Sequence, residues 1–566
     1  MGFYQKLELI QNKKIIIIIV SVFAIQFLIM ISIYGDNWSV EVPLGLPITS
    51  EYFITNNYPY ELIFRESDSH LHIFSRIPFL VSLFFDNFNT KNLLYISWGL
   101  LSGSIYLLYL ILRRTNEQMI WLLIPLSALV YNPIQYFTFL WAHASFVYGI
   151  PFFSTILITY FLNKKELDKK SYFISLATGI ISSFSLIGGT IVLVSGLFPL
   201  IHRKEKKKLV IWILSVVVVI ITYLYAWSET NRVRIQVVPE KQIITFLKLI
   251  ALPYTVKLDS LYTALGISMI ILFIVSFILI KKQFKFNTLL PWMQMAFVGS
   301  CLAIMVPLGR GAVAYYYSTL TVLFAIGLMG FIGLILVFLR QPLQKKKILM
   351  VVFVVAIIVQ VLLLVPSYYM GWKLANDFNN YETKRNSCYS LNPDNEICSF
   401  DQYYNLTKDD NFERLQIMNG FLKQKKGIFV DDSLNKKTFD DQIFYEKTLE
   451  KINNVKKGFG ELNEVNNIKS SMIKEPLITI SGWITDEDKM PVDYMYILSN
   501  NKPLIKISQF EVNQNEIRFS NYGIKSAWNV SFLSGYLENN CNNITMIGFK
   551  ENTKIIIDDV IMLCKN

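Results

Sequence analysis

The sequence predicts an α-helical polytopic membrane protein with about 11 transmembrane helices, followed by a C-terminal β-sandwich-like domain outside the cytoplasm. Hydrophobic residues make up 53% of the 566 residues and charged residues only 17%, which is typical of a multi-spanning protein. Apolar runs long enough to cross a bilayer recur as far as Pro366, with short basic clusters between them. After Pro366 the chain is polar and rich in asparagine, which predicts a separate domain.

The first apolar stretch, Ile15 to Tyr34, follows Lys13 and Lys14. Its length of about 20 residues exceeds a signal-peptide core, and no small-residue cleavage site follows, so we expect an uncleaved first span. The net charge of +12 could also indicate nucleic-acid binding. The basic residues fall in short runs between apolar stretches, a pattern that sets membrane topology, so no nucleic-acid partner is expected.

The basic clusters orient the predicted helices. If the clusters at 113–114, 163–170, 202–208, 281–285 and 340–347 all face the cytoplasm, the N-terminus lies inside and the C-terminus outside. The expected spans are 14–34, 92–112, 119–133, 147–162, 171–186, 188–201, 209–226, 258–280, 288–306, 313–339 and 348–366.

Two places are too short or too irregular for ordinary spans. The segment 171–201 has basic clusters at both ends and Gly188-Gly189 near its middle, so each arm falls short of a full crossing at about 1.5 Å per residue. Half-depth or re-entrant helices are therefore expected, and protein or a water-filled cavity must surround their ends. "NPIQYFTFLWAHASF", residues 132–146, interrupts the stretch 119–162 in a similar way. Both places fall on the outer side, which indicates a cavity that opens outward.

The first outer loop, about 35–91, gathers titratable groups in "RESDSHLHIFSR", residues 65–76. The apolar segment 77–88 after it predicts an amphipathic helix in the membrane interface. Acid, base and cation would then lie where a lipid head group lies. The candidate site residues of this loop are Asp36, Glu66, Asp68, His70, His72 and Arg76.

Three further outer segments add candidates for the same site. His143 and its neighbour Trp141 lie between spans, and three of the four histidines face this side, which favours a shared site over isolated structural histidines. A zinc site is an alternative, but His-x-His at 70–72 lacks a third ligand at a fixed spacing.

Arg310 lies between two glycines in "PLGRGA", residues 307–312. Glycine lets a backbone approach an anion closely, and arginine binds phosphate through two parallel hydrogen bonds. Tyr315 follows as a polar aromatic neighbour; the alternative is a tight hairpin with an arginine that reaches to the interface. Arg232 and Arg234, in the outer loop 227–257, either line an anion-binding groove or belong to an ordinary solvated loop.

The tail is expected to comprise a polar, partly helical linker, 367–475, and a β-rich domain, 476–566, with seven short strand-like runs. Its four cysteines predict disulfides between neighbours in sequence, Cys388 with Cys398 and Cys541 with Cys564. Sugar binding, covering of the active site and a stabilising cap all remain open as roles for the domain.

Four segments together carry a resemblance: "GDNW" at 35–38, "RESDSHLHIFSR" at 65–76, "NPIQYFTFLWAHASF" at 132–146 and "PLGRGA" at 307–312. The chain resembles the C-type glycosyltransferase superfamily, membrane enzymes that use polyprenyl-phosphate-linked sugars. The resemblance implies that Asp68, with Asp36 and Glu66 as rivals, is the catalytic base or a metal contact. It implies phosphate binding by Arg310 and Arg76. The sequence departs from the family by lacking a paired-aspartate motif, so a divalent metal and catalysis itself stay open.

The expected function is transfer of a sugar from a polyprenyl phosphate to a glycan, lipid or protein acceptor at the outer face of the cell membrane. A carboxylate can accept the proton of the attacking hydroxyl, and an arginine can stabilise the phosphate that leaves. The alternatives are a transporter or flippase for a lipid-linked glycan, and a non-catalytic envelope protein with a binding tail. Transporters tend to carry charged residues within spans and internal repeats, and the sequence shows neither clearly.

Overall fold

The computed structural model describes two units of the chain, Met1–Thr383 and Lys384–Asn566, and each is presented by itself. The described residues are 13–34, 71–85, 90–227, 239–254, 259–310, 318–339, 347–391, 454–457, 459–468, 477–487, 492, 494–507, 527–533, 541–550 and 553–564.

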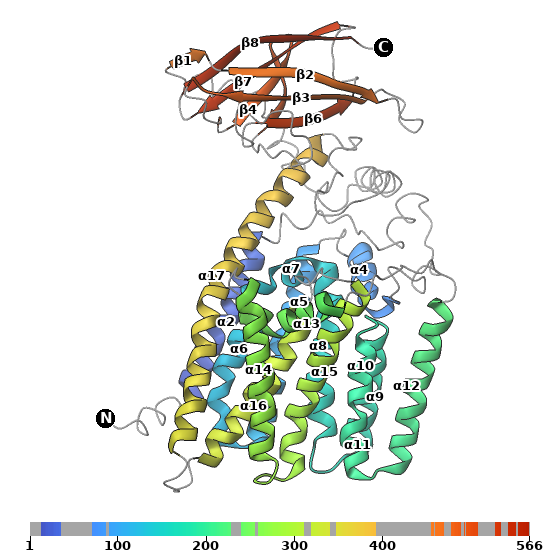
Figure 1. Cartoon of the computed structure of the whole chain (residues 1–566). Coiled ribbons are helices and arrows are strands. Elements are labelled where there is room, and N and C mark those ends of the chain that lie inside the picture. Colours follow the sequence, from blue (N-terminus) through green and yellow to red (C-terminus); the bar gives the residue numbers. More distant parts are fainter. Residues whose placement is uncertain are drawn as a thin grey trace. The chain divides into compact units, whose positions relative to one another are not determined.

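The first unit is a helical membrane bundle, as the sequence predicts (Figure 1). Among the described residues, eight helices are long and apolar enough to cross a bilayer. They are α2 (Lys13–Tyr34), α5 (Thr90–Thr115), α8 (Ala142–Leu162), α12 (Lys206–Trp227), α14 (Asp259–Ile280), α15 (Phe286–Arg310), α16 (Ser318–Leu339) and α17 (Lys347–Leu391). The protein is therefore a multi-pass membrane protein.

The other three expected spans correspond to shorter helices. The segment 119–133 contains the 3-10 helix η3 (Glu117–Leu122) and α6 (Leu123–Val130). The pair 171–201 forms α9 (Lys169–Ser183), α10 (Gly189–Ser195) and α11 (Leu197–Arg203). With 15 residues, α9 is about 22 Å long, which is less than the roughly 30 Å of a hydrocarbon core.

Glycines allow this short hairpin to close. A Cβ atom on Gly189 would lie 1.9 Å from the carbonyl oxygen of Ser182, so only glycine lets α10 approach the end of α9. A Cβ atom on Gly196 would lie 2.2 Å from the indole of Trp212, whose Nε1 donates to the carbonyl oxygen of Leu193 over 2.8 Å. The hairpin is thus packed directly against α12.

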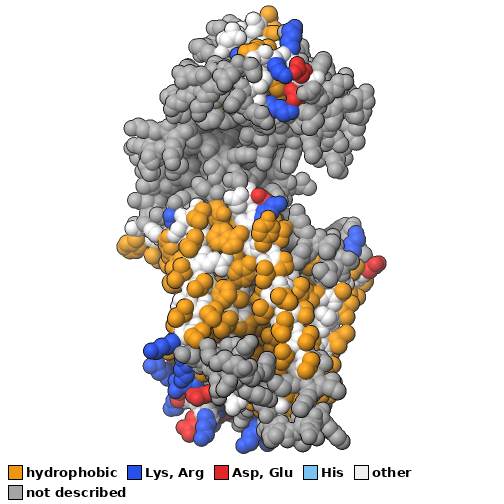
Figure 2. All heavy atoms as spheres, turned by 90° about the vertical axis from the view of Figure 1, so that its left-hand side faces the viewer, with side chains coloured by type: hydrophobic (Ala, Val, Ile, Leu, Met, Phe, Trp, Pro, Cys, Tyr) orange, Lys and Arg blue, Asp and Glu red, His pale blue; other side chains and the backbone are white. Residues whose placement is uncertain are grey.

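Helix α12 meets the bundle along one stripe of buried residues, Trp212, Val216, Val219 and Tyr223. Their spacing of four, three and four residues is that of one helical face. The remaining faces of α12 expose valine, isoleucine and leucine, which is the surface that a bilayer would cover. On the face drawn in Figure 2, hydrophobic side chains cover the middle of the bundle, and the largest group of lysine and arginine side chains lies at its lower end.

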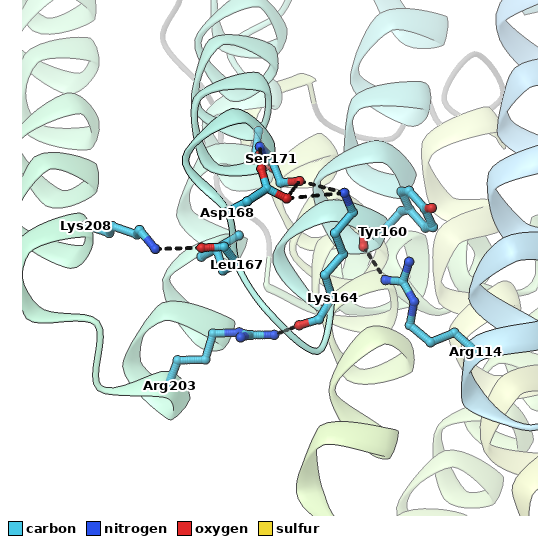
Figure 3. A network of polar contacts seen from close by, with 9 residues as sticks. Arg114, Tyr160, Lys164, Leu167, Asp168, Ser171, Arg203 and Lys208 are labelled. Carbon is cyan, nitrogen blue, oxygen red and sulfur yellow. Dashed lines mark hydrogen bonds and ion pairs between the residues drawn. The ribbon is translucent and has the colours of Figure 1, made fainter.

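The connections that follow α5, α8, α11 and α14 lie at one end of the bundle, here called the basic end, and Figure 3 shows part of it. The described lysines of α13 (Pro239–Ala251), Lys241 and Lys248, belong to the connection at the opposite end and are an exception to this pattern. The Arg114 guanidinium donates to the Tyr160 carbonyl oxygen over 2.8 Å, which joins the end of α5 to the end of α8. The His202 ring lies 4.8 Å from that of Phe286, so the 281–285 turn belongs to the same end. Clustering of these cations at one end fits the topology predicted by the positive-inside rule.

The interrupted segment 132–146 is built from short pieces. Asn132 caps the 3-10 helix η4 (Pro133–Gln135), α7 (Tyr136–Leu140) follows, and extended backbone at Trp141 separates α7 from α8. The Asn132 side-chain amide also donates to the Pro253 carbonyl oxygen and to the Ser367 hydroxyl, each over 2.9 Å. These bonds connect η5 (Leu252–Tyr254), which follows α13 (Pro239–Ala251), to α17.

Helix α17 corrects one expected boundary. The predicted span ended at residue 366, whereas the helix continues through Pro366 to Leu391 and crosses the border between the two units. Tertiary contacts hold the segment after the proline: the Tyr368 hydroxyl donates to the Ala128 carbonyl oxygen over 2.8 Å. A Cβ atom on Gly371 would lie 2.2 Å from the backbone nitrogen of Ile134, so the helix packs closely on η4.

The second unit contains two β-sheets (Figure 1). One has the strand order β1-β8-β7-β4-β5 and the other β2-β3-β6. The side chain of Ile484 on β3 lies against Gly548 on β7, so the sheets face each other as in a sandwich. The strands are β1 (Asn454–Lys457), β2 (Phe459–Ile468), β3 (Leu477–Thr485), β4 (Tyr494–Ser499), β5 (Lys502–Ile507), β6 (Ala527–Leu533), β7 (Cys541–Lys550) and β8 (Thr553–Cys564).

Two of these strands lie earlier than the sequence predicts. The region before 476 was expected to be a polar linker, yet β1 and β2 lie there. Their sequences, "NVKK" and "FGELNEVNNI", are too polar for the alternation that marks a half-buried strand. Pairing with established neighbours defines them instead: β1 runs parallel to β8, and β2 runs antiparallel to β3.

Candidate functional site

The described part of the titratable motif, residues 71–76, forms the start of helix α4 (Ile73–Phe85) and the two residues before it. This helix lies at the end of the bundle opposite to α11 (Figure 1). It covers most of the predicted interfacial segment 77–88. His72, Arg76 and Phe79 recur at intervals of four and three residues and are 5%, 1% and 3% exposed. This spacing places them on one face, which packs against α5 and α8. The two described titratable residues of the motif, His72 and Arg76, are therefore turned into the protein.

A hydrogen bond from His72 joins the start of α4 to the turn between α9 and α10. Its Nδ1 atom lies 2.9 Å from the carbonyl oxygen of Ser185. A carbonyl oxygen only accepts, so Nδ1 carries the hydrogen and Nε2 is the basic nitrogen of the neutral ring. The backbone nitrogen of Phe74 donates to the Phe184 carbonyl oxygen over 3.3 Å, and Ser75 Oγ donates to the His72 carbonyl oxygen over 3.1 Å.

Three aromatic side chains surround His143, which lies in the first turn of α8. The His72 ring meets it edge-on at 5.3 Å between centroids, Trp141 lies at 5.6 Å and Phe79 at 6.2 Å. The helix break at Trp141, with φ −90° and ψ 106°, sets the start of α8 at this level. We call His72, Arg76, Trp141 and His143 the histidine–arginine cluster.

Arg76 supplies a buried positive charge beside these rings. Its backbone nitrogen donates to the His72 carbonyl oxygen over 3.1 Å, so the two residues are one helical turn apart. Burial lowers the pKa of the Arg76 guanidinium to about 10. The group is still protonated at neutral pH, and electrostatic interactions are stronger there than in water. A cation in such a place favours an anionic ligand.

Arg310 ends α15 at the same end of the bundle. The opposite end of this helix, Phe286, contacts His202 at the basic end. Two turns before Arg310, Leu302 packs on the α9–α10 turn, since a Cβ atom on Gly188 would lie 2.6 Å from its Cδ2 atom. The same turn holds Ser185 and therefore His72. The side chain of Arg310 lies outside the described residues.

The remaining predicted site residues, Asp36, Glu66, Asp68, His70, Arg232, Arg234 and Tyr315, lie outside the described residues. Chain length still limits Asp68, because four residues of backbone reach at most about 14 Å from His72. Of the predicted residues, the structure brings together His72, Arg76, Trp141 and His143.

Sequence reasoning missed Ser185 and Phe79 as neighbours of the site. The backbone carbonyl oxygen of Ser185 accepts the hydrogen bond from His72. Every residue has this group, so the residue type at position 185 could not indicate the contact. Phe79 was visible only as one apolar residue of an amphipathic helix. Within the described residues, no group of three or more His, Cys, Asp or Glu side chains is placed to hold a metal ion.

Comparison with known proteins gives distant likenesses only. No family model and no curated protein matches the chain. A crystal structure of ArnT from Cupriavidus metallidurans bound to undecaprenyl phosphate is similar, with 11% identity, a TM-score of 0.40, and coverage of 71% of this chain and 88% of that one. ArnT from the same organism in the apo state gives 11% identity and a TM-score of 0.40 over 72% and 88% of the two chains. Likeness at this level does not assign an activity to this chain.

Proposed function

We propose that the chain is a membrane glycosyltransferase that moves a sugar from a polyprenyl-phosphate donor to a glycan, lipid or protein acceptor. The observation that carries the proposal is the buried Arg76, one turn from His72 and on the segment that follows Asp68. An almost fully buried cation one helical turn from His72, at the end of an apolar bundle, suits a lipid phosphate. The polyprenyl chain of such a donor is itself suited to the apolar surface of the bundle.

The proposed chemistry uses one acid–base group and at least one arginine. Asp68, with Asp36 and Glu66 as rivals, accepts the proton of the acceptor hydroxyl while its oxygen bonds to the anomeric carbon. The bond between that carbon and the phosphate oxygen breaks, and the electron pair leaves with the polyprenyl phosphate. Arg310 and Arg76 stabilise the charge that grows on the phosphate.

The other predicted residues are assigned to binding. Trp141, His143 and His72, with Tyr315, form the sugar and acceptor surface, because aromatic rings pack against the apolar faces of sugars. His70 is a second candidate base beside Asp68, and Arg232 and Arg234 are further phosphate contacts. A divalent metal stays an open part of this proposal.

The proposed site lies on the outer side of the membrane. The histidine–arginine cluster and the basic end are at opposite ends of α8, which begins beside Trp141 and ends beside the Arg203 contact. If the basic end faces the cytoplasm, as the positive-inside rule predicts, the cluster faces outward. The C-terminal β unit is likewise proposed to be extracytoplasmic.

The proposal is tested with the purified full-length chain, a radiolabelled polyprenyl-phosphate sugar and an envelope fraction as acceptor source. Release of polyprenyl phosphate together with labelled acceptor supports a transferase. Movement of the intact donor between leaflets without release indicates a flippase instead. Neither turnover nor movement, with donor binding absent, indicates a non-catalytic envelope protein.

A further inference from the structure

The basic end contains a second feature, independent of the proposed active site. The α8–α9 and α11–α12 connections, residues 164–170 and 203–208, carry nine lysine and arginine side chains against three carboxylates, a net charge of +6.

Some of these cations build the connections. The Arg203 guanidinium donates to the carbonyl oxygens of Leu162 and Lys165 over 3.1 and 3.3 Å, and also to that of Lys164. Lys208 Nζ donates to the Leu167 carbonyl oxygen over 2.9 Å (Figure 3). These hydrogen bonds join the two connections into one surface, in which backbone carbonyl oxygens bind Arg203 and Lys208.

Asp168 also has a structural role. Its carboxylate accepts from the backbone nitrogen of Ser171 over 2.6 Å and from the Ser171 hydroxyl over 2.9 Å, and it caps the start of α9. These hydrogen bonds lower the pKa of the Asp168 carboxyl group. Glu205 forms an ion pair with Lys208 at 3.3 Å. Two of the three carboxylates therefore have partners within the connections.

Six lysines on this surface are exposed, and the described contacts include no side-chain hydrogen bond or ion pair for them. We call them the lysine surface: Lys165, Lys169, Lys170, Lys204, Lys206 and Lys207.

The lysine surface adjoins the start of an apolar helix, where lipid head groups are expected. Lys206 and Lys207 begin α12, and Val210 and Ile211, one turn later, are 55% and 45% exposed on a helix whose exposed faces are apolar. Ammonium groups at this border meet the phosphates of the adjacent leaflet. Clusters of four to eight basic residues beside a membrane helix are typical of acidic-lipid binding.

We propose that the lysine surface binds the head groups of anionic phospholipids and so anchors the α8–α9 and α11–α12 connections to the leaflet. The occupant is a lipid and not a soluble anion, because the charges flank an exposed apolar helix face that only acyl chains cover. The inference does not depend on the activity of the protein or on which side of the membrane the basic end faces.

The test uses the full-length protein in phosphatidylcholine bilayers with spin-labelled phosphatidylglycerol or spin-labelled phosphatidylcholine as probes. The fraction of immobilised label gives the preference of the protein for the anionic lipid. We expect a severalfold preference in the wild type. The variant Lys204→Asn, Lys206→Gln, Lys207→Gln should reduce it at least twofold; asparagine is chosen because residue 204 has φ 58°.

A matched control removes three charges elsewhere, Lys241→Gln, Lys457→Gln and Lys554→Gln, and should keep the wild-type preference. Sodium chloride at about 0.5 M should abolish the preference of the wild type for the anionic lipid by screening the charges. This experiment needs no variant, so it tests the proposal even if the variant fails to fold. The proposal is overturned if the wild type shows no preference, if the control loses as much as the variant, or if inorganic phosphate at millimolar concentration displaces the label.

Discussion

The Nδ1 atom of His72 donates to the carbonyl oxygen of Ser185 at 2.9 Å, across 113 residues of sequence. This bond joins the titratable motif to the turn of a helical hairpin that is too short to cross the bilayer. Gly188 packs the same turn on Leu302 of α15, the helix that ends at Arg310. The turn thus connects the two sequence segments to which acid–base and phosphate-binding roles are assigned.

The first prediction concerns the contribution of the His72–Ser185 hydrogen bond to stability. In His72→Asn the Nδ2 amide takes the place of Nδ1 and can keep the bond to Ser185, whereas His72→Phe leaves that buried carbonyl oxygen unsatisfied. We expect His72→Phe to lower the free energy of unfolding by about 1–3 kcal/mol and His72→Asn by less. Thermal unfolding in detergent measures the difference. Equal losses in both variants would show that the bond contributes nothing.

Arg76 separates binding from folding. Arg76→Met keeps most of the side-chain length and removes the cost of burying the charge. We expect Arg76→Met to fold and to lose binding of a polyprenyl phosphate at least tenfold, and Arg76→Lys to retain part of it. Retention of full donor affinity by Arg76→Met would exclude Arg76 as a phosphate contact.

The pH dependence of Arg76 follows from the direction of its shift. Burial lowers its pKa to about 10, so the folded state binds this proton less tightly than the unfolded chain does. Burial of the charge therefore costs stability at every pH below about 10, and that cost disappears as the pH rises further. Between pH 5 and 8 Arg76 stays protonated, so any change of turnover in this window belongs to a carboxylate or a histidine.

Hydropathy was sufficient to predict the spans because a bilayer requires long apolar helices whatever their neighbours are. Gly188-Gly189 and the basic clusters were sufficient to predict the short hairpin. The continuation of α17 past Pro366 was not predictable, since Tyr368 and Gly371 are held by contacts with Ala128 and η4. The bond from His72 was equally hidden, because its acceptor is a backbone group.

Gly189 tests the hairpin itself. In Gly189→Ala the new Cβ atom would lie 1.9 Å from the Ser182 carbonyl oxygen, a backbone atom that cannot move aside alone. We expect the free energy of unfolding to fall by several kcal/mol, or no folded protein to form, because the added methyl group overpacks the site severely. Gly99→Ala on α5 is the control, because its Cβ atom would meet nothing within 4 Å. That change should be neutral or stabilising by up to about 1 kcal/mol. Fluorescence-detected size exclusion and thermal unfolding compare the two.

The tail cysteines test the compartment of the β unit. Cys541 and Cys564 face each other in register on the antiparallel strands β7 and β8. We predict a disulfide between them, worth about 3 kcal/mol for a loop of this size. A peptide map without reduction should show the linked pair, and both thiols alkylated in untreated cells would contradict it. The pairing of Cys388 with Cys398 remains a prediction, since residue 398 lies outside the described part of the chain.

The central prediction is that Asp68 and Arg310 act in one site. Transfer from a lipid phosphate needs a carboxylate near the acceptor oxygen and a cation near the phosphate, on opposite sides of the anomeric carbon. The two groups should therefore lie about one sugar phosphate apart and form no direct ion pair. Backbone geometry is compatible with this, because Asp68 is within about 14 Å of His72 along the chain and Arg310 ends the helix that packs on the same turn.

Two substitutions distinguish the proposed roles. Asp68→Asn keeps the shape of the side chain and removes the base, so turnover should fall by at least about a hundredfold while donor binding stays within twofold of the wild type. Arg310→Lys keeps the charge and loses the paired hydrogen bonds, so donor binding and turnover should both fall. Glu66→Gln and Asp36→Asn are the matched controls, because each removes one rival carboxylate from the same outer loop. Wild-type turnover in Asp68→Asn, together with its loss in either control, would move the base to that residue; cysteine labelling that places 68 and 310 on different sides of the membrane would exclude a shared site.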